Sequence, residues 1–226
     1  EPVYKASDKI APDKAHVRFK NVKQFVSRGG LKLKHAIDSF GLDVTDKVML
    51  DIGSSTGGFT DCALQHGAKH VYAVDVGTNQ LAYQLRIDER VSVMEQTNFK
   101  ETVIENFEPL PDVISIDVSF TSIVPILRHI KALFSHNIEI AALIKPQFES
   151  YLEEREESGI ITNPDTHYHV VQRVLKECEL LGLNISAIER SPITGTKGNI
   201  EYLFYLTSKE SEYALTDKDI KTVVYG

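Results

Sequence analysis

Apolar residues form two alternating patterns along the chain, short continuous runs and helix-like spacing. Mostly apolar runs predict seven strands, at residues 47–51, 70–75, 91–95, 112–117, 138–144, 183–188 and 200–206. Apolar positions that repeat about every 3.6 residues predict helices at 27–40, 59–65, 80–87, 122–134 and 164–181. Regular alternation of strands and helices requires crossover connections, and these build a mostly parallel sheet with helices on both faces.

The order of these elements predicts the fold class. The run 138–144 is apolar at nearly every position, as in a strand covered on both faces. No helix separates 183–188 from 200–206, so we expect these two strands to pair antiparallel at one edge. The prediction is an α/β, Rossmann-like, doubly wound sheet, mostly parallel, with an antiparallel edge strand. We expect this domain at 47–208, a basic linker and helix at 21–46, and a C-terminal tail or helix at 209–226.

The composition is that of an ordinary globular protein. The 226 residues are 42% hydrophobic and 25% charged, which excludes collagen-like, low-complexity and wholly disordered chains. No apolar run approaches the ~20 residues that cross a bilayer, and no signal segment opens the chain. Cys62 and Cys178 lack metal or redox spacing, so we expect them to pack as small apolar groups in a reduced, cytoplasmic protein. No metal site and no stable membrane insertion are predicted, and the sequence does not indicate an oligomeric state.

Charge is distributed unevenly along the chain. The net charge is −7, yet residues 1–40 hold nine Lys or Arg against four acids. A basic N-terminal end on an acidic protein points to an anionic partner there, although a solvated basic stretch explains it equally well.

Glycine and polar residues gather where the first predicted strands end. In an open parallel sheet, ligands bind beyond the carboxyl ends of the strands. Gly53 lets the chain turn sharply after the first strand, and Gly57 and Gly58 let the backbone approach a ligand. Asp75 ends the second strand, where a carboxylate can accept hydrogen bonds from both ribose hydroxyls of an adenosine. The predicted cofactor contacts are Asp51, Gly53, Ser55, Thr56, Gly57, Gly58, Asp75, Val76, Thr97 and Asn98.

The spacing of the glycines separates two classes of nucleotide. A dinucleotide site has the pattern G-x-G-x-x-G, with backbone amides aimed at a pyrophosphate. Residues 53–58 instead read G-x-x-x-G-G, with Ser55 where the second Gly belongs. This favours S-adenosylmethionine and disfavours a nicotinamide oxidoreductase. The chain also lacks a G-x-x-x-x-G-K-[ST] run, which disfavours ATP hydrolysis.

Four ionisable residues are expected near the mouth of the same sheet. Asp117 ends the fourth predicted strand, Lys145 ends the fifth and Glu201 opens the last, while Lys32 lies on the basic helix before the first strand. Each has an ordinary explanation as a helix cap or a surface charge. Lys145 is the most informative, because it follows an apolar run and precedes a proline, which directs it towards the site.

Six collinear motifs over residues 20–208 resemble those of TlyA-type proteins, haemolysin-named relatives of FtsJ-like ribosomal RNA 2'-O-methyltransferases. They are SRGGLKL (27–33), DIGSSTGGFT (51–60), VDVG (74–77), IDVSF (116–120), IKPQFE (144–149) and GNIEY (198–202). The resemblance implies transfer of a methyl group from S-adenosylmethionine to a ribose 2'-hydroxyl, of a cytidine, in ribosomal RNA or a ribosomal subunit. Residues 1–20 resemble the closing strands of a small RNA-binding domain, of which this chain would hold only the tail.

The resemblance also implies a catalytic tetrad, which falls on Lys32, Asp117, Lys145 and Glu201. In the resulting hypothesis, Lys145 binds the ribose hydroxyl and helps to deprotonate it, and Asp117 holds Lys145 near the methyl group. Lys32 and Glu201 orient the ribose and its phosphate.

One segment departs from the family pattern. After residues 148–149, family members carry a loop with Gly and Lys, whereas residues 150–158 here read SYLEEREES. Acids repel phosphate, so we expect this loop not to grip RNA directly. Arg28 and Lys34, on the basic segment around Lys32, are the candidate RNA contacts.

Two further functions stay open beside the methyltransferase. A membrane-active haemolysin is disfavoured, because the chain shows no membrane-spanning stretch and no cationic amphipathic helix. A non-catalytic RNA-binding or ribosome-assembly factor is disfavoured by the intact residue types of the tetrad.

Overall fold

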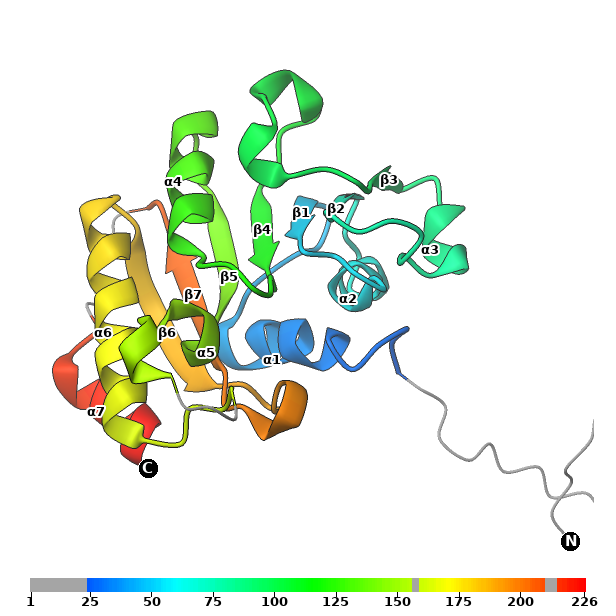
Figure 1. Ribbon diagram of the computed structural model, residues 1–226. Helices are drawn as coiled ribbons and strands as arrows, with labels where there is room; N and C mark the ends of the chain where they lie inside the picture. Colours follow the sequence, from blue (N-terminus) through cyan, green and yellow to red (C-terminus); the bar gives the residue numbers. More distant parts are fainter. Residues whose placement is uncertain (1–23, 156–158, 210–214) are drawn as a thin grey trace, which may run out of the picture.

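The computed structural model describes residues 24–155, 159–209 and 215–226, which form a seven-stranded sheet flanked by helices (Figure 1). The strands are β1 (Val48–Ile52), β2 (His70–Val74), β3 (Val91–Met94), β4 (Val113–Ile116), β5 (Glu139–Ile144), β6 (Asn184–Arg190) and β7 (Tyr202–Thr207). The helices are α1 (Gly30–Phe40), α2 (Gly58–Gln65), α3 (Tyr83–Arg86), α4 (Val124–Leu133), α5 (Pro146–Glu149), α6 (Pro164–Leu180) and α7 (Asp217–Tyr225). The predicted RNA-binding-domain tail at 1–20 lies outside the described residues.

The strand order, β3-β2-β1-β4-β5-β7-β6, confirms the predicted α/β fold. The strands from β3 to β5 pair in parallel, and β7 runs antiparallel to both of its neighbours, β5 and β6. The antiparallel pairing therefore lies at one edge, as predicted, with β6 outermost and β7 one position inside. The order reverses between β1 and β4, and such a reversal is where doubly wound sheets bind ligands.

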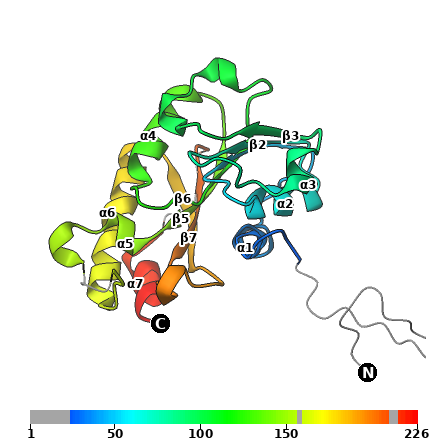
Figure 2. The ribbon, with the colours of Figure 1, turned by 45° about the vertical axis from the view of Figure 1, so that its right-hand side comes forward.

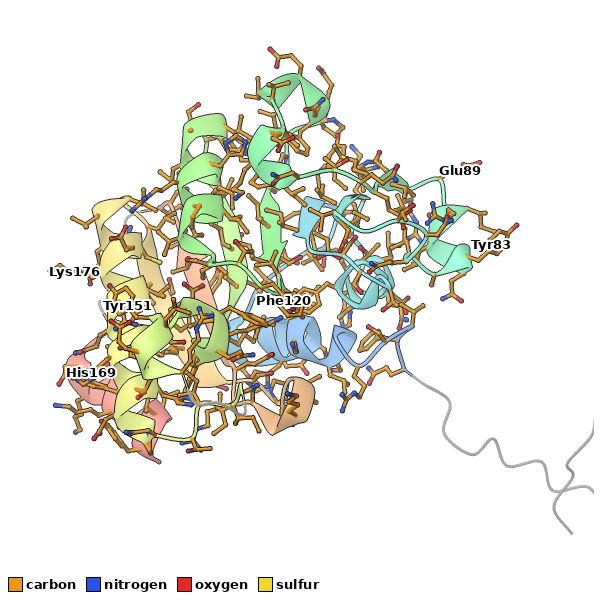
Figure 3. All side chains as sticks on the ribbon, in the orientation of Figure 1. Tyr83, Glu89, Phe120, Tyr151, His169 and Lys176 are labelled. Carbon is orange, nitrogen blue, oxygen red and sulfur yellow. The ribbon has the colours of Figure 1, made fainter. Side chains whose placement is uncertain are left out.

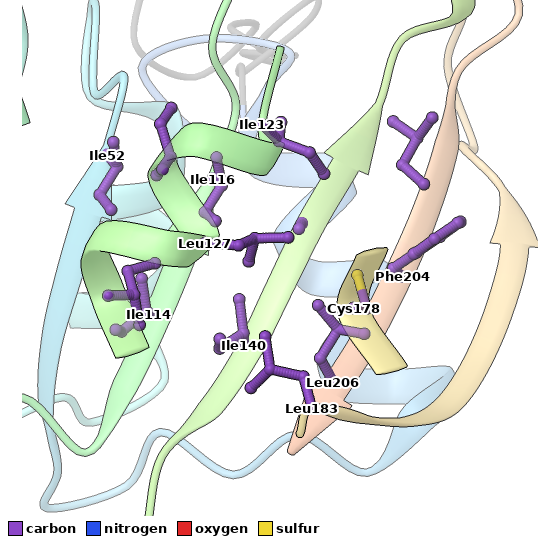
Figure 4. Close-up of a cluster of buried hydrophobic side chains, with 14 of the residues drawn as sticks. Ile52, Ile114, Ile116, Ile123, Leu127, Ile140, Cys178, Leu183, Phe204 and Leu206 are labelled. Carbon is purple, nitrogen blue, oxygen red and sulfur yellow. The ribbon is translucent and has the colours of Figure 1, made fainter. Parts of the chain in front are cut away.

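The sheet separates two hydrophobic cores. Alternate residues of β1 point to opposite faces, so that Leu50 joins the core with α4 and α6, whereas Met49 joins the core with α1 and α2. Figure 2 shows these helices on opposite sides of the sheet, and Figure 4 shows the first core. β5 contributes Ile140 to the first core and Ala141 to the second, which confirms a strand covered on both faces.

The two cysteines pack as small apolar groups, as the sequence predicts, and the structure places one in each core. Cys178 packs in the first core and Cys62 in the second, and neither is accessible to solvent. Burial raises the pKa of each thiol to about 12, so both are unreactive at neutral pH.

α1 begins three residues later than predicted and packs directly onto the domain. Residues 27–30 form a tight turn, and a side chain on Gly30 would lie 2.4 Å from the ring of Phe25. This close packing coincides with the first residue of the helix, Gly30. Leu33 and Ala36 are buried in the second core with α2, so the segment forms a layer of the domain.

α3 is shorter than the predicted helix at 80–87 because a carboxylate holds the preceding residues in a loop. Glu95 accepts hydrogen bonds from the backbone N–H groups of Asn79, Gln80 and Leu81. It also pairs with Arg86 at 2.7 Å, and this hydrogen bond is the main reason that the pKa of Glu95 falls to about 2. The loop at 77–81 is therefore shaped by one side chain from the end of β3.

The C-terminal segment ends in a helix, α7. Its residues Ile220 and Val224 are buried in the first core. Within the described part of the chain, every helix is too short or too polar to cross a membrane.

Candidate functional site

Two cavities meet at the point where the strand order reverses. The smaller, about 590 Å³, extends over the carboxyl ends of β1, β2 and β4. The larger, about 880 Å³, is lined by the start of α1, the ends of β4 and β5, and the segment before β7. The residues that line both are Gly53, Ser55, Asp117, Ser119 and Phe120. A ligand in one cavity can therefore touch a ligand in the other across the ends of β1 and β4.

Two glycines beside this junction allow segments of the backbone to approach closely. Gly53 has a φ of +84°, and a Cβ there would lie 2.6 Å from the carbonyl oxygen of Asp117. Gly58 opens α2, and a Cβ there would lie 2.8 Å from the backbone nitrogen of Gly30. The first glycine lets the turn after β1 lie against the backbone of Asp117, and the second lets α1 lie across the start of α2.

The smaller cavity contains the predicted contacts for adenosine. Asp75 accepts hydrogen bonds from the backbone N–H groups of Ser55 (2.8 Å) and Gly77 (2.7 Å), one on each carboxylate oxygen. Each oxygen keeps a second lone pair for a ribose hydroxyl. Val76, whose side chain is 75% exposed, offers an apolar surface to a flat ring. Two further predicted residues that line this cavity are Thr97 and Asn98.

Asp51 supports the glycine turn from inside the sheet. Its carboxylate accepts hydrogen bonds from the N–H (3.1 Å) and hydroxyl (2.7 Å) of Thr60 and from the Ser115 hydroxyl (2.9 Å). Burial raises the pKa of Asp51 to about 6, because these neutral donors offset only part of the desolvation. Asp51, Thr56 and Gly58 line the larger cavity, whereas Gly57 lines neither cavity and packs against Leu85.

The four residues of the expected tetrad come together in the larger cavity. Lys145 Nζ lies 2.6 Å from Asp117 Oδ1. Lys32 Nζ lies 3.1 Å from Asp117 Oδ2 and 2.7 Å from Glu201 Oε2. The charges therefore alternate along one row, although Lys32 and Glu201 are 169 residues apart in the chain. Lys145 also donates a hydrogen bond to the hydroxyl of Ser119 at 3.2 Å.

Burial and ion pairing shift the pKa values of Lys32 and Asp117 in opposite directions. Burial lowers the pKa of Lys32, but the attraction of Asp117 and Glu201 outweighs it, so that the pKa is raised. Burial raises the pKa of Asp117, but the nearby Lys145 and Lys32 outweigh it, so that the pKa is lowered. Both groups are therefore charged at neutral pH. Among the described residues, Lys145 forms one ion pair and Lys32 forms two.

Comparison with known proteins identifies the family. The model for FtsJ-like methyltransferases matches residues 25–208, which include every lining residue of both cavities. The chain belongs to the FtsJ-like methyltransferase family. This confirms the resemblance that the six motifs indicated.

Three relatives illustrate the similarity. A Bacillus subtilis protein, YqxC, described as a candidate rRNA methyltransferase, is 49% identical over 187 residues, which cover 82% of this chain and 66% of the relative. The 16S/23S rRNA (cytidine-2'-O)-methyltransferase TlyA of Mycobacterium tuberculosis is 36% identical over 203 residues, 90% of this chain and 75% of the relative. A solved structure from Lactococcus lactis, described as a candidate hemolysin, has a TM-score of 0.85 at 48% identity and covers 90% of this chain and 98% of that one. The chain thus spans about two thirds of the B. subtilis relative.

The exposed charges around the larger cavity of this FtsJ-like methyltransferase are all cations among the described lining residues. They are Arg28, Arg155 and Lys197. The carboxylates of the same lining are buried or ion-paired. Arg28 was predicted as an RNA contact, whereas Lys34 pairs with Asp38 on α1 and lines neither cavity. Sequence reasoning missed Arg155 and Lys197, because no local pattern indicates which loop cation faces a cavity.

The acidic loop after α5 turns one acid away from the cavity and one cation towards it. Glu154 accepts two hydrogen bonds from Arg173 on α6, each 2.8 Å, and this pairing lowers the pKa of Glu154. Arg173 also lies over the ring of Tyr151, 4.2 Å from its centroid. Arg155 lines the cavity and donates to the carbonyl of Ser150 at 3.0 Å. The sequence prediction considered only the acidic residues of this loop, and it therefore did not anticipate that Arg155 would line the cavity.

Phe120 is another candidate that sequence reasoning missed. It lies three residues after Asp117, has a φ of 62° and is 91% exposed (Figure 3). Its ring centroid lies 5.1 Å from that of Phe148, and both rings line the larger cavity. An exposed aromatic side chain on a left-handed backbone is costly, which makes Phe120 a candidate for ligand contact. The sequence feature that could have indicated it is an aromatic residue three positions after Asp117.

Proposed function

We propose that this chain transfers a methyl group from S-adenosylmethionine to a ribose 2'-hydroxyl of ribosomal RNA, with cytidine as the target. The observation that carries the proposal is the position of Asp117. It lines both cavities and holds Lys145 by an ion pair of 2.6 Å, so the pocket with adenosine contacts adjoins the amine expected to act on the hydroxyl. The name of the M. tuberculosis relative supports ribosomal RNA and cytidine as the target.

The charges around the glycine turn fit S-adenosylmethionine better than a dinucleotide. Asp51, Asp75 and Asp117 are carboxylates that line the two cavities around Gly53. They would repel a pyrophosphate, whereas they attract the sulfonium and ammonium groups of S-adenosylmethionine. Asp75 and Val76 would hold the adenosine, and the turn after β1 would hold the amino-acid portion.

Each member of the tetrad has a distinct task in the proposed reaction. S-adenosylmethionine supplies an electrophilic methyl group when it is bound. Lys145 orients the ribose hydroxyl, and Asp117 holds Lys145 between the two cavities. Lys145 first releases one proton to solvent, and the neutral amine then receives the hydroxyl proton as the oxygen takes the methyl group. Lys32, which bonds to two carboxylates, stays charged and fixes Asp117 and Glu201 in place. Most of the rate enhancement then comes from holding the hydroxyl in line with the methyl group.

The outer part of the larger cavity suits single-stranded RNA. The exposed cations at its rim, Arg28, Arg155 and Lys197, can neutralise backbone phosphates. Phe120 and Phe148 offer rings on which an unstacked base can stack. This combination fits a nucleotide whose base is turned out of its helix, and it leads us to propose action on ribosomal RNA or ribosomal subunits in the cytoplasm.

Mapping of labelled methyl groups tests this function. The full-length chain is incubated with tritiated S-adenosylmethionine and either free ribosomal RNA or ribosomal subunits, and the labelled nucleotides are identified. We expect label on a ribose 2'-oxygen and none with Lys145→Ala. Absence of label on both substrates, in a protein that binds S-adenosylhomocysteine, would contradict the proposal. Lysis of lipid vesicles that is unaffected by Lys145→Ala would support the haemolysin alternative instead.

A further inference from the structure

Gln147 is a polar residue of the larger cavity to which the proposed reaction gives no task. It lies on the short helix α5, two residues after Lys145, and lines the larger cavity but not the smaller one. Its side-chain oxygen, Oε1, is inaccessible to solvent and accepts no hydrogen bond from any described residue. An amide in this state loses its hydrogen bonds with water and gains none in return, so it destabilises the folded protein.

Donors close to Gln147 in the chain are committed elsewhere. Pro146 has no N–H group, and the N–H groups of Phe148 and Ser150 donate to the carbonyls of Lys145 (2.8 Å) and Pro146 (2.9 Å). The ammonium group of Lys145 contacts Asp117 and Ser119. Residues 24–155, 159–209 and 215–226 therefore supply no hydrogen-bond donor to this oxygen, and few buried polar groups in native proteins are left in that condition.

The chemistry of Oε1 limits which ligand groups can bind to it. Oε1 is an acceptor, so its partner must bring an N–H or O–H group. A backbone phosphate offers only acceptors and does not fit. The terminal amide turns readily about its last side-chain bond, because that torsion is soft, so Oε1 can turn towards the cavity that Gln147 lines.

We propose that Gln147 binds the edge of the target base through a base N–H group. This inference rests on the proposed function. In that function Lys145, on the same segment, takes the ribose hydroxyl, and a base stacked on Phe120 and Phe148 presents its edge beside them. Gln147 is then a substrate-binding residue whose orphaned amide is satisfied only when the nucleotide enters.

Replacement by apolar residues of similar length tests the inference, because the two readouts should move in opposite directions. For Gln147→Leu and Gln147→Met, we expect kcat/KM for ribosomal RNA to fall about tenfold, the worth of one buried hydrogen bond. The affinity for S-adenosylhomocysteine should be unchanged. The melting temperature should be equal to or higher than that of the wild type, because an unsatisfied polar group has been removed.

Gln172 provides a matched control. It is also half-buried, but its amide donates to the hydroxyl of Tyr168 (2.6 Å) and to Asp217 (3.0 Å), away from both cavities. Gln172→Leu should lower the melting temperature and leave kcat/KM unchanged. The inference is overturned if both Gln147 variants keep the wild-type kcat/KM, or if they lose stability and cofactor affinity together.

A second substrate separates the base from the ribose. Once the methylated position is mapped, an RNA fragment with an abasic ribose there keeps the hydroxyl but lacks the base. We expect the wild type and Gln147→Leu to methylate this fragment at the same rate. A tenfold difference that persists would assign the hydrogen bond to a ribose hydroxyl and overturn the assignment to the base. A wild type that methylates no ribosomal RNA would instead contradict the proposed function itself.

Discussion

Asp51 on β1 and Asp117 directly after the neighbouring strand β4 are two mostly buried carboxylates, and their surroundings shift their pKa values in opposite directions. Asp51 is surrounded by neutral donors, and burial raises its pKa to about 6. Asp117 lies between two ammonium groups, which outweigh burial and lower its pKa. The difference shows that burial alone does not decide whether a carboxylate is held as an anion; the charge of its partners does.

The same contrast separates the two halves of the site. The smaller cavity is built from the turns that directly follow β1, β2, β3 and β4, and backbone N–H groups position its key acid, Asp75. The larger cavity depends on ion pairs between side chains far apart in the chain, such as Lys32 and Glu201. Changes in the first half should act on cofactor binding, and changes in the second half on transfer.

The largest expected effect is that of Lys145→Ala. We expect kcat to fall by about 10²- to 10⁴-fold, because the hydroxyl loses its proton acceptor, while S-adenosylhomocysteine binds nearly as before. Methyl-transfer assays and calorimetric titration measure the two quantities. Lys176→Ala, an exposed lysine on α6 (Figure 3), is the control. Equal loss of cofactor affinity and activity would remove the distinction between the halves.

The next effect concerns Asp51 and the pH dependence of stability. Because its folded pKa of about 6 lies above the ordinary 3.8, the folded protein keeps a proton that the unfolded chain releases. Its contribution to the free energy of unfolding should therefore fall as pH rises from about 4 to 6, by at most about 3 kcal/mol. Urea denaturation should show Asp51→Asn becoming more stable relative to the wild type over this window.

Asp117 provides the opposite case in the same experiment. Its pKa is lowered, so its contribution to stability is present above its ordinary pKa of 3.8 and is lost as pH falls below that value. Parallel pH profiles for the two positions would show that their environments do not differ as described.

A smaller effect is expected for Asp75→Ala. Loss of charge-assisted hydrogen bonds to the ribose should weaken binding of S-adenosylhomocysteine by about 10- to 100-fold. At saturating S-adenosylmethionine, kcat should stay close to the wild-type value, because the tetrad is untouched. Calorimetric titration and initial-rate kinetics test both statements, and a kcat defect at saturation would connect Asp75 to the chemical step.

The smallest effect is expected for Arg155→Ala. Removal of one phosphate contact should weaken RNA binding severalfold and reduce the slope of log affinity against log salt concentration by about one. Arg128, which pairs with Glu177 on the outside of the molecule, is the control. An unchanged salt slope would place Arg155 outside the RNA path and restore the expectation that the acidic loop does not touch RNA.

Local patterns predicted the elements better than their ends. All seven predicted strands are present, and their ends lie within one or two residues of the predicted ends. A continuous apolar run directly indicates a buried strand. The helix predicted at 80–87 shrank to α3, because Glu95 holds the loop before it. The helix predicted from Ser27 begins at Gly30, because Phe25 packs against that glycine. Both differences arise from specific side-chain contacts that the spacing of apolar residues does not indicate.

Motifs and spacing were enough to indicate the sheet, the glycine turn, Asp75 and the members of the tetrad, since each lies at a strand end or in a motif. Motifs and spacing did not indicate which residues contact one another. They did not predict that Lys32 bridges two acids or that Arg155 faces the cavity while Glu154 turns away. They also did not predict that Gln147 Oε1 accepts no hydrogen bond from a described residue. Such facts depend on distances between residues remote in the chain. Electrostatic and hydrogen-bond energies change steeply with those distances, so the folded arrangement had to supply them.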